Sequence, residues 1–174
     1  WVTADQDAQI HADIRRGWLI STEHYTIQTN HSIESGVALS RKLEELYRVW
    51  SLLFVRYYAS EATVSGMFSG RALSARPPHF KVVCFRDRAD YNEHLRPVMP
   101  NIEVSVGFYH GTSGSAYFFQ GEGFQERTLL HEATHQLFDQ ARPTPPDVGL
   151  ERNFWIIEGV AMFMETLREE NGFY

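Results

Sequence analysis

Apolar residues recur along the first third of the chain with the spacing of a helix. From Ser32 to about Tyr58, leucine and aromatic residues return every three or four positions, so this stretch is predicted to be one long amphipathic helix. Glu44, Glu45 and Arg48 fall beside the apolar stripe, and we expect them to face solvent. Such a helix is predicted to serve as scaffold, because its apolar face needs a partner to cover it.

Shorter runs of β-branched and aromatic residues predict strands. Segments 24–29 and 80–85 have the length and composition of strands, and the apolar second one reads as buried. Two further runs, 104–110 and 115–120, flank the sequence GTSG at 111–114, which is typical of a hairpin turn. These patterns predict a small sheet that includes at least one hairpin.

The remaining segments divide into a loop and three helices. Residues 59–79 lose periodicity and gain glycine and proline, so we expect a long loop or mobile flap there. Short helical patterns cover about 88–95, 124–141 and 153–169. The chain is therefore expected to form one α+β domain over residues 1–174, excised from a longer protein.

Composition narrows the class of protein. Hydrophobic residues make up 43% of the chain and aromatic residues 14%, which is typical of a folded globular domain. The net charge is −6 and no basic cluster is dense, so nucleic acid is not an expected partner. No apolar run approaches the length of a membrane span. The single cysteine, Cys84, lies in an apolar run and is expected to be a small buried residue.

The most informative stretch is LLHEATHQLF at 129–138. In a helix, residues four apart lie on the same face, so His131 and His135 would project side by side. Glu132 is rotated by about 100° from His131, which places it near a water on the same ion rather than on the ion itself. This spacing predicts two zinc ligands and a general base. The alternative is an amphipathic helix whose histidines are simply half-buried.

Catalytic zinc usually takes three protein ligands. A third histidine on the same helix would require glycine at 138 and histidine at 141, where this chain has phenylalanine and alanine. The downstream carboxylates are Asp139, Asp147, Glu151, Glu158, Glu165, Glu169 and Glu170. Glu158 is preferred because its apolar surroundings make an unpaired carboxylate costly. It could instead bond a neighbouring helix end, a tyrosine or a tryptophan. Gly159, in the same helix, predicts close approach of another backbone.

The two stretches HEATH (131–135) and WIIEGVAMFME (155–165) together resemble the gluzincin metallopeptidases. More specifically, they resemble bacterial peptidase-MA-like domains. The resemblance implies a zincin-like fold with a small, mostly antiparallel sheet, a long scaffold helix, an HExxH helix and a glutamate-ligand helix. It implies Zn²⁺ on His131, His135 and Glu158, with Glu132 as base and a peptide or protein as substrate. It also implies that an edge strand at 115–120 binds the substrate backbone, and it favours an extracytoplasmic location.

Several roles stay open at this stage. Glu165 lies seven residues after Glu158, on the same helix face, where it could accept the second N–H of a ligating imidazole. It could equally be an ordinary exposed glutamate. Tyr109, His110 and Tyr117 are candidates for stabilising an oxyanion, and nothing in the sequence selects among them. A zinc-containing binding module without turnover is the main alternative function, and a purely structural zinc site is a weaker one.

Overall fold

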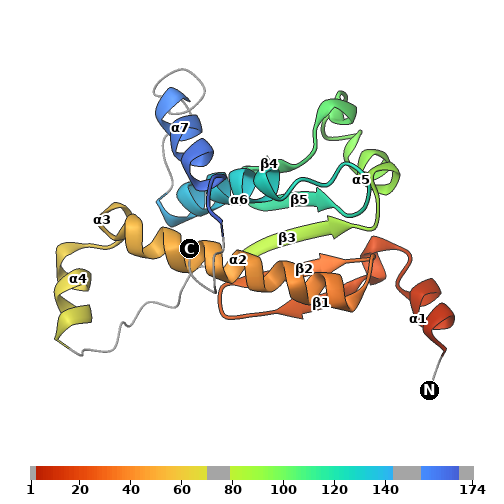
Figure 1. The fold of residues 1–174 in the computed structure, drawn as a ribbon, viewed down its shortest axis with the longest axis horizontal. Helices are drawn as coiled ribbons and strands as arrows, with labels where there is room; N and C mark the ends of the chain where they lie inside the picture. The colour runs from red at the N-terminus through yellow and green to blue at the C-terminus, as the bar shows by residue number, and fades with distance from the viewer. Residues whose placement is uncertain (1–2, 70–78, 143–153, 169–174) are drawn as a thin grey trace.

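The computed structural model describes residues 3–69, 79–142 and 154–168, and these form a five-stranded sheet with helices on both faces (Figure 1). The strand order is β1-β2-β3-β5-β4. The elements in chain order are α1 (Ala4–Ile10), η1 (Ile14–Arg16), β1 (Trp18–Ser21), β2 (Tyr25–Thr29), α2 (Ile33–Leu53), α3 (Val55–Tyr58), α4 (Glu61–Phe68), β3 (Phe80–Phe85), α5 (Arg88–Leu95), η2 (Ile102–Val104), β4 (Phe108–His110), β5 (Ser115–Phe119), α6 (Glu126–Ala141) and α7 (Phe154–Met164).

The larger core lies on one face of the sheet, beneath α2 and α6. Alternate residues of the three inner strands point to this face and meet the apolar stripes of the two helices, as a period of two requires. Its fully buried aromatic and leucine members include Tyr25, Leu43, Trp50, Phe118 and Leu129. The opposite face carries a smaller core with α5, built around Phe85, Tyr91 and Phe119. The sheet is thus covered on both faces.

The prediction of a mostly antiparallel sheet is wrong, because the sheet is mixed. The outer pairs β1–β2 and β4–β5 are antiparallel, whereas β2–β3 and β3–β5 are parallel. Helices α2 and α5 lie in the two connections that lead into the parallel neighbours, and parallel pairing needs such long crossovers. The predicted hairpin across Gly111–Gly114 is confirmed by the antiparallel register of β4 and β5.

The long scaffold helix is confirmed but shorter than predicted. Ser32 caps it, with its hydroxyl accepting a hydrogen bond from the Ser35 N–H at 3.1 Å. It ends at Leu53, and after Phe54 the chain continues as the separate short helix α3. Within the segment predicted as a loop, α4 forms over Glu61–Phe68, while 70–78 lie outside the described residues. The N-terminal helix α1 was not predicted.

Glu44 does not face solvent as predicted. Its carboxylate accepts hydrogen bonds from the Thr22 hydroxyl at 2.5 Å and the His24 backbone N–H at 2.8 Å. Its second oxygen lies 2.7 Å from Nδ1 of His24, whose ring stacks on Tyr47. The glutamate therefore ties the turn between β1 and β2 to the scaffold helix.

Cys84 lies on the central strand β3, and its side chain is buried as expected. Burial raises the pKa of its thiol to about 12, so the group stays neutral. None of the described helices combines the length and apolarity needed to cross a bilayer.

Candidate metal centre

Helix α6 directs its two motif histidines toward Glu158 of α7, whereas Gln136 of the same helix is buried and donates to the Lys81 carbonyl in β3. The helix buries Leu129, Leu130, Ala133 and Leu137 in the larger core, whereas His131, Glu132 and His135 are only partly buried. Helix α7 packs against α6 (Figure 1). The amphipathic pattern of α6 therefore aims the motif histidines at the second helix.

Three ligand-type side chains converge between these helices, as the sequence predicted for His131, His135 and Glu158. The Nε2 atoms of the two histidines are 3.1 Å apart. Nε2 of His131 lies 3.3 Å from Oε2 of Glu158, and Nε2 of His135 lies 3.3 Å from Oε1. One ligand atom from each residue falls in a group with all separations within 4.8 Å, so the three could hold a metal ion.

The spacing of these atoms matches a small tetrahedral ion. Bonds of about 2.0–2.1 Å to nitrogen and oxygen place neighbouring ligands of a tetrahedral ion roughly 3.3 Å apart. The 3.1 Å between the two ring nitrogens is close to that value, and each nitrogen lies 3.3 Å from a different oxygen of the Glu158 carboxylate. Two imidazoles and one carboxylate are also the ligand types that zinc takes in open sites, with the fourth position left for water.

In the neutral cluster, acceptor atoms of the histidines and Glu158 face one another, and a bound cation would stabilise this arrangement. Nδ1 of His131 lies 3.2 Å from Oε2 of Glu165, so this nitrogen carries the proton that the carboxylate accepts. In neutral His131 the Nε2 lone pair then faces the carboxylate of Glu158. Burial lowers the pKa of His135 and so favours its neutral form. Either a metal ion or an additional proton must therefore lie among these acceptor atoms.

Glu165 occupies the position in which it can orient a ligating imidazole. It follows the last residue of α7 and is 17% exposed. Besides His131, it contacts Arg127, with Nη2 of the arginine 2.6 Å from Oε1. Arg127 was not predicted as part of the site. Its place four residues before His131, on the same face of α6, was the available signal.

Glu132 is held by the edge of the sheet. Its Oε2 accepts the backbone N–H of Tyr109, in β4, at 3.0 Å. Burial raises the pKa of Glu132, while the Tyr109 N–H and the nearby His131 lower it by smaller amounts. A buried carboxylate with a raised pKa and one anchored oxygen is suited to accept a proton and release it again.

The three candidates for oxyanion stabilisation are separated by the sheet. Of these, Tyr109 has its side chain on the face covered by α6, where its hydroxyl donates to Asp139 at 2.5 Å. Tyr117 packs with the smaller core on the opposite face. The ring of His110 lies near Phe108, with Nδ1 3.0 Å from the Ser113 hydroxyl. The structure thus does not bring His110 or Tyr117 to the cluster.

Two expectations about the surroundings of the site are wrong. Strand β5 is not an edge strand, because it pairs with β3 on one side and β4 on the other, and β4 is the edge. Gly159 does not mark a close backbone approach. It is exposed, and among the described residues no atom outside its own helix would lie within 4 Å of an added Cβ. Ala161, two residues later, is fully buried instead.

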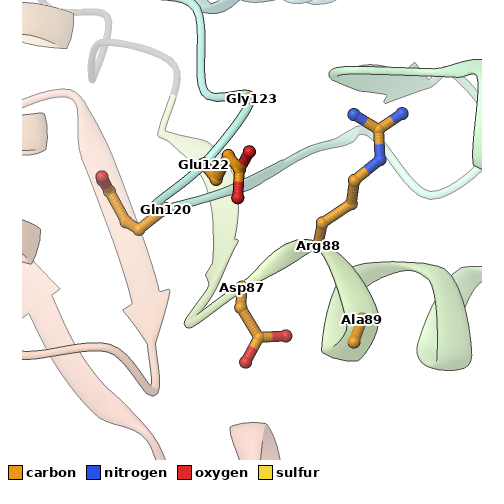
Figure 2. Close-up of a pocket in the computed structure, with 6 residues that line it drawn as sticks. All are labelled: Asp87, Arg88, Ala89, Gln120, Glu122 and Gly123. Atoms are coloured by element: carbon orange, nitrogen blue, oxygen red, sulfur yellow. The ribbon is translucent and has the colours of Figure 1, made fainter.

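A separate open pocket of about 440 Å³ lies where α5 begins and the β5–α6 connection passes (Figure 2). Asp87, Arg88 and Ala89 line it from one side, and Gln120, Glu122 and Gly123 from the other. The guanidinium of Arg88 points away from Asp87 in Figure 2 and donates to the Glu103 carbonyl at 2.7 Å. None of the three candidate ligands lines this pocket, so it is distinct from the cluster.

No protein-family model matches this sequence, and no curated protein matches it significantly. The resemblance to gluzincins therefore rests on the two motifs themselves and on the contacts that their residues make.

Proposed function

We propose that this protein is a zinc-dependent peptidase of the gluzincin type, with zinc on His131, His135 and Glu158. The observation that carries the proposal is the convergence of three side chains from the HExxH helix and the EGVA helix: the two Nε2 atoms are 3.1 Å apart, and each lies 3.3 Å from a different oxygen of Glu158. A structural zinc site normally has four protein ligands. Only three such side chains meet here within the described part of the chain, which favours an open, catalytic site.

Zinc, when bound in such a site, acidifies a coordinated water and polarises a substrate carbonyl. The protein's own contribution begins with Glu132, which accepts the proton as the water oxygen attacks the peptide carbonyl carbon. The same carboxyl then protonates the departing amine nitrogen as the C–N bond breaks. The Tyr109 N–H holds Oε2 of Glu132, which leaves Oε1 for this proton transfer.

The edge strand β4 supports a peptide substrate. Its Tyr109 N–H faces outward from the sheet toward Glu132, so the base and the free edge of the sheet adjoin each other. An extended peptide adding to β4 as a strand would therefore pass close to the base. Peptide or protein is accordingly the proposed substrate class.

The decisive experiment is the variant Glu132→Gln. Glutamine keeps an oxygen for the Tyr109 N–H but cannot accept a proton, so we expect peptide hydrolysis to fall by at least about 100-fold. Zinc content, measured by elemental analysis, should stay at the wild-type level. Turnover that persists in this variant would contradict the proposed role of Glu132. Absence of zinc from the wild-type protein after incubation with the metal would overturn the whole proposal.

A binding module that holds zinc without turnover is the second candidate. It is favoured by one observation: the Tyr109 hydroxyl is committed to Asp139, and the side chains of His110 and Tyr117 lie away from the cluster. Within the described residues, an oxyanion donor is thus not already in place. Assay of the zinc-loaded wild-type chain against a diverse peptide library separates the two functions. Chelator-sensitive cleavage supports the peptidase, and full zinc occupancy without cleavage supports the binding module.

A further inference from the structure

An exposed arginine joins the two helices that carry the candidate ligands. Nη2 of Arg127, in the first turn of α6, lies 2.6 Å from Oε1 of Glu165, just after the end of α7. The arginine side chain is 71% exposed and the glutamate 17% exposed. Exposed ion pairs usually contribute little to folding stability. This pair is distinguished by what the other oxygen of the glutamate contacts.

Arg127 is the outermost member of a polar ladder between the helices. Arg127, His131 and His135 follow each other at intervals of four and so share one face of α6. Glu158 and Glu165 are seven apart and share one face of the opposing segment. The contacts run in order: Glu165 meets Arg127 at 2.6 Å and His131 at 3.2 Å, and Glu158 meets His131 and His135 at 3.3 Å.

Each oxygen of Glu165 has a separate partner. Oε1 accepts from Arg127, and Oε2 faces Nδ1 of His131. Glu165 lies in the turn that follows α7, and its backbone N–H still donates to the Ala161 carbonyl at 2.9 Å. The guanidinium therefore restricts the rotation of the carboxylate that orients the His131 ring. The Nε2 atom of that ring is the one that faces Glu158 and His135.

We propose that Arg127 is a positioning residue for the metal site, acting through Glu165 on His131. This inference rests on the proposed function, since it concerns the affinity of the same site for zinc. Partners one step removed from a metal typically change its affinity by about 10–100-fold when they are replaced. Glu165 contacts the candidate ligand His131 directly, and Arg127 contacts Glu165. We therefore expect about a 10-fold effect for the arginine.

The test compares zinc affinity in Arg127→Met, Arg127→Lys and the matched control Arg96→Met. Arg96 pairs with Glu103 at the same Nη2–Oε1 distance of 2.6 Å on exposed surface, and neither residue contacts the candidate ligands. Competition with a chromophoric zinc chelator should give about 10-fold weaker binding for Arg127→Met and partial recovery for Arg127→Lys. Arg96→Met, which removes the same charge, should bind zinc like the wild type. The melting temperatures of the metal-free variants should all match.

Two outcomes would overturn the inference. Wild-type affinity in Arg127→Met would show that the arginine does not position the site. Equal weakening in Arg127→Met and Arg96→Met would show an effect of net charge alone. A Co²⁺-substituted sample adds a spectroscopic measure, because the d–d bands of Arg127→Met should differ from those of the control. Failure of the proposed function is recognised separately: zinc-loaded wild-type protein that binds zinc but cleaves no peptide contradicts the peptidase alone, whereas wild-type protein that binds no zinc overturns the metal site and this inference with it.

Discussion

Two clusters of histidine with glutamate lie within the described part of the chain, and they differ in the partners that surround the carboxylate. At His24 and Glu44, the carboxylate faces donors: a hydroxyl, a backbone N–H and a ring nitrogen lie within 2.5–2.8 Å of its two oxygens. At His131, His135 and Glu158, two ring nitrogens face each other and one carboxylate, at 3.1–3.3 Å. The first cluster is complete without a ligand, whereas the second brings acceptors together.

This difference teaches how a structural histidine can be told from a ligating one. Both clusters use the same residue types, and both are partly buried. What separates them is the set of partners: Glu44 accepts from a hydroxyl and a backbone N–H, whereas the described partners of Glu158 are two ring nitrogens. Acceptors that converge without donors cost free energy unless a cation or an extra proton compensates them. The second cluster is therefore the one that we expect to bind metal.

The largest effect should come from removing one acceptor from each cluster in turn. Glu158→Gln replaces the one anionic candidate ligand with a neutral amide, so zinc affinity should fall by more than the roughly 100-fold upper range for indirect partners. Glu44→Gln makes the same chemical change in the other cluster and should leave zinc affinity at the wild-type value. Isothermal titration with zinc measures both variants. Equal affinities for the two variants would remove the distinction between the clusters.

A smaller effect concerns the dependence of stability on pH. Burial by itself would raise the pKa of Glu44, but hydrogen bonds from Thr22 and His24 outweigh it and hold the pKa below its ordinary value of 4.5. A carboxylate with a lowered pKa stabilises the fold above about pH 4.5, and this contribution is lost as the pH falls through the folded-state pKa. Glu44→Gln should therefore lower the free energy of unfolding by about 1–2 kcal/mol at pH 7.

At pH 3.5 the difference between Glu44→Gln and the wild type should shrink, because this pH lies below the ordinary pKa of 4.5 and the unfolded state there binds more protons than the folded state. Urea unfolding at the two pH values measures this change. The control is Glu93→Gln, on the exposed side of α5, which removes the same charge at another position. A stability difference for Glu44→Gln that is unchanged between the two pH values would contradict the role given to its ionised form.

The smallest effect concerns the helix that carries Glu158. Gly159 is exposed in the interior of α7, and an added Cβ would meet no described atom within 4 Å outside the helix. Gly159→Ala should therefore raise the free energy of unfolding by about 0.5–1 kcal/mol, because alanine loses less backbone entropy in a helix. Thermal unfolding should show a rise of a few degrees with zinc affinity unchanged. A lower melting temperature would indicate that another backbone does approach Gly159 closely, as the sequence predicted.

Much of the fold followed from local patterns. Strand β3 and helix α5 have the predicted bounds, since the first is a short apolar run and the second begins after Asp87, whose side chain accepts the Asp90 N–H. Helix α1 was missed because it buries no residue and therefore has no apolar stripe. The parallel pairing was missed because strand direction depends on how crossovers pack, which periodicity does not encode.

The site followed from spacing where one helix sets the geometry. An interval of four residues in α6 places His131 beside His135 in any helix. The contact of Glu158 with both histidines depends on how α7 packs on α6, and it was anticipated only from the apolar setting of the carboxylate. The same packing decides the partners of Glu165. The spacing of Arg127 to His131 was visible in the sequence, but its contact with Glu165 also depends on how α7 packs on α6.

The single thiol of the protein, Cys84, can be used to distinguish metal release from unfolding of the sheet. Alkylating reagents attack the thiolate, and Cys84 sits with a pKa of about 12 beneath the larger core, on the middle strand of the sheet. Its labelling rate therefore reports how often the sheet itself opens. Loosening confined to α7 on metal release would leave the thiol covered by α2 and α6 and therefore unlabelled, although it could alter the fluorescence of the four tryptophans. Loss of the ligand and loss of the fold can thus be followed independently in one sample.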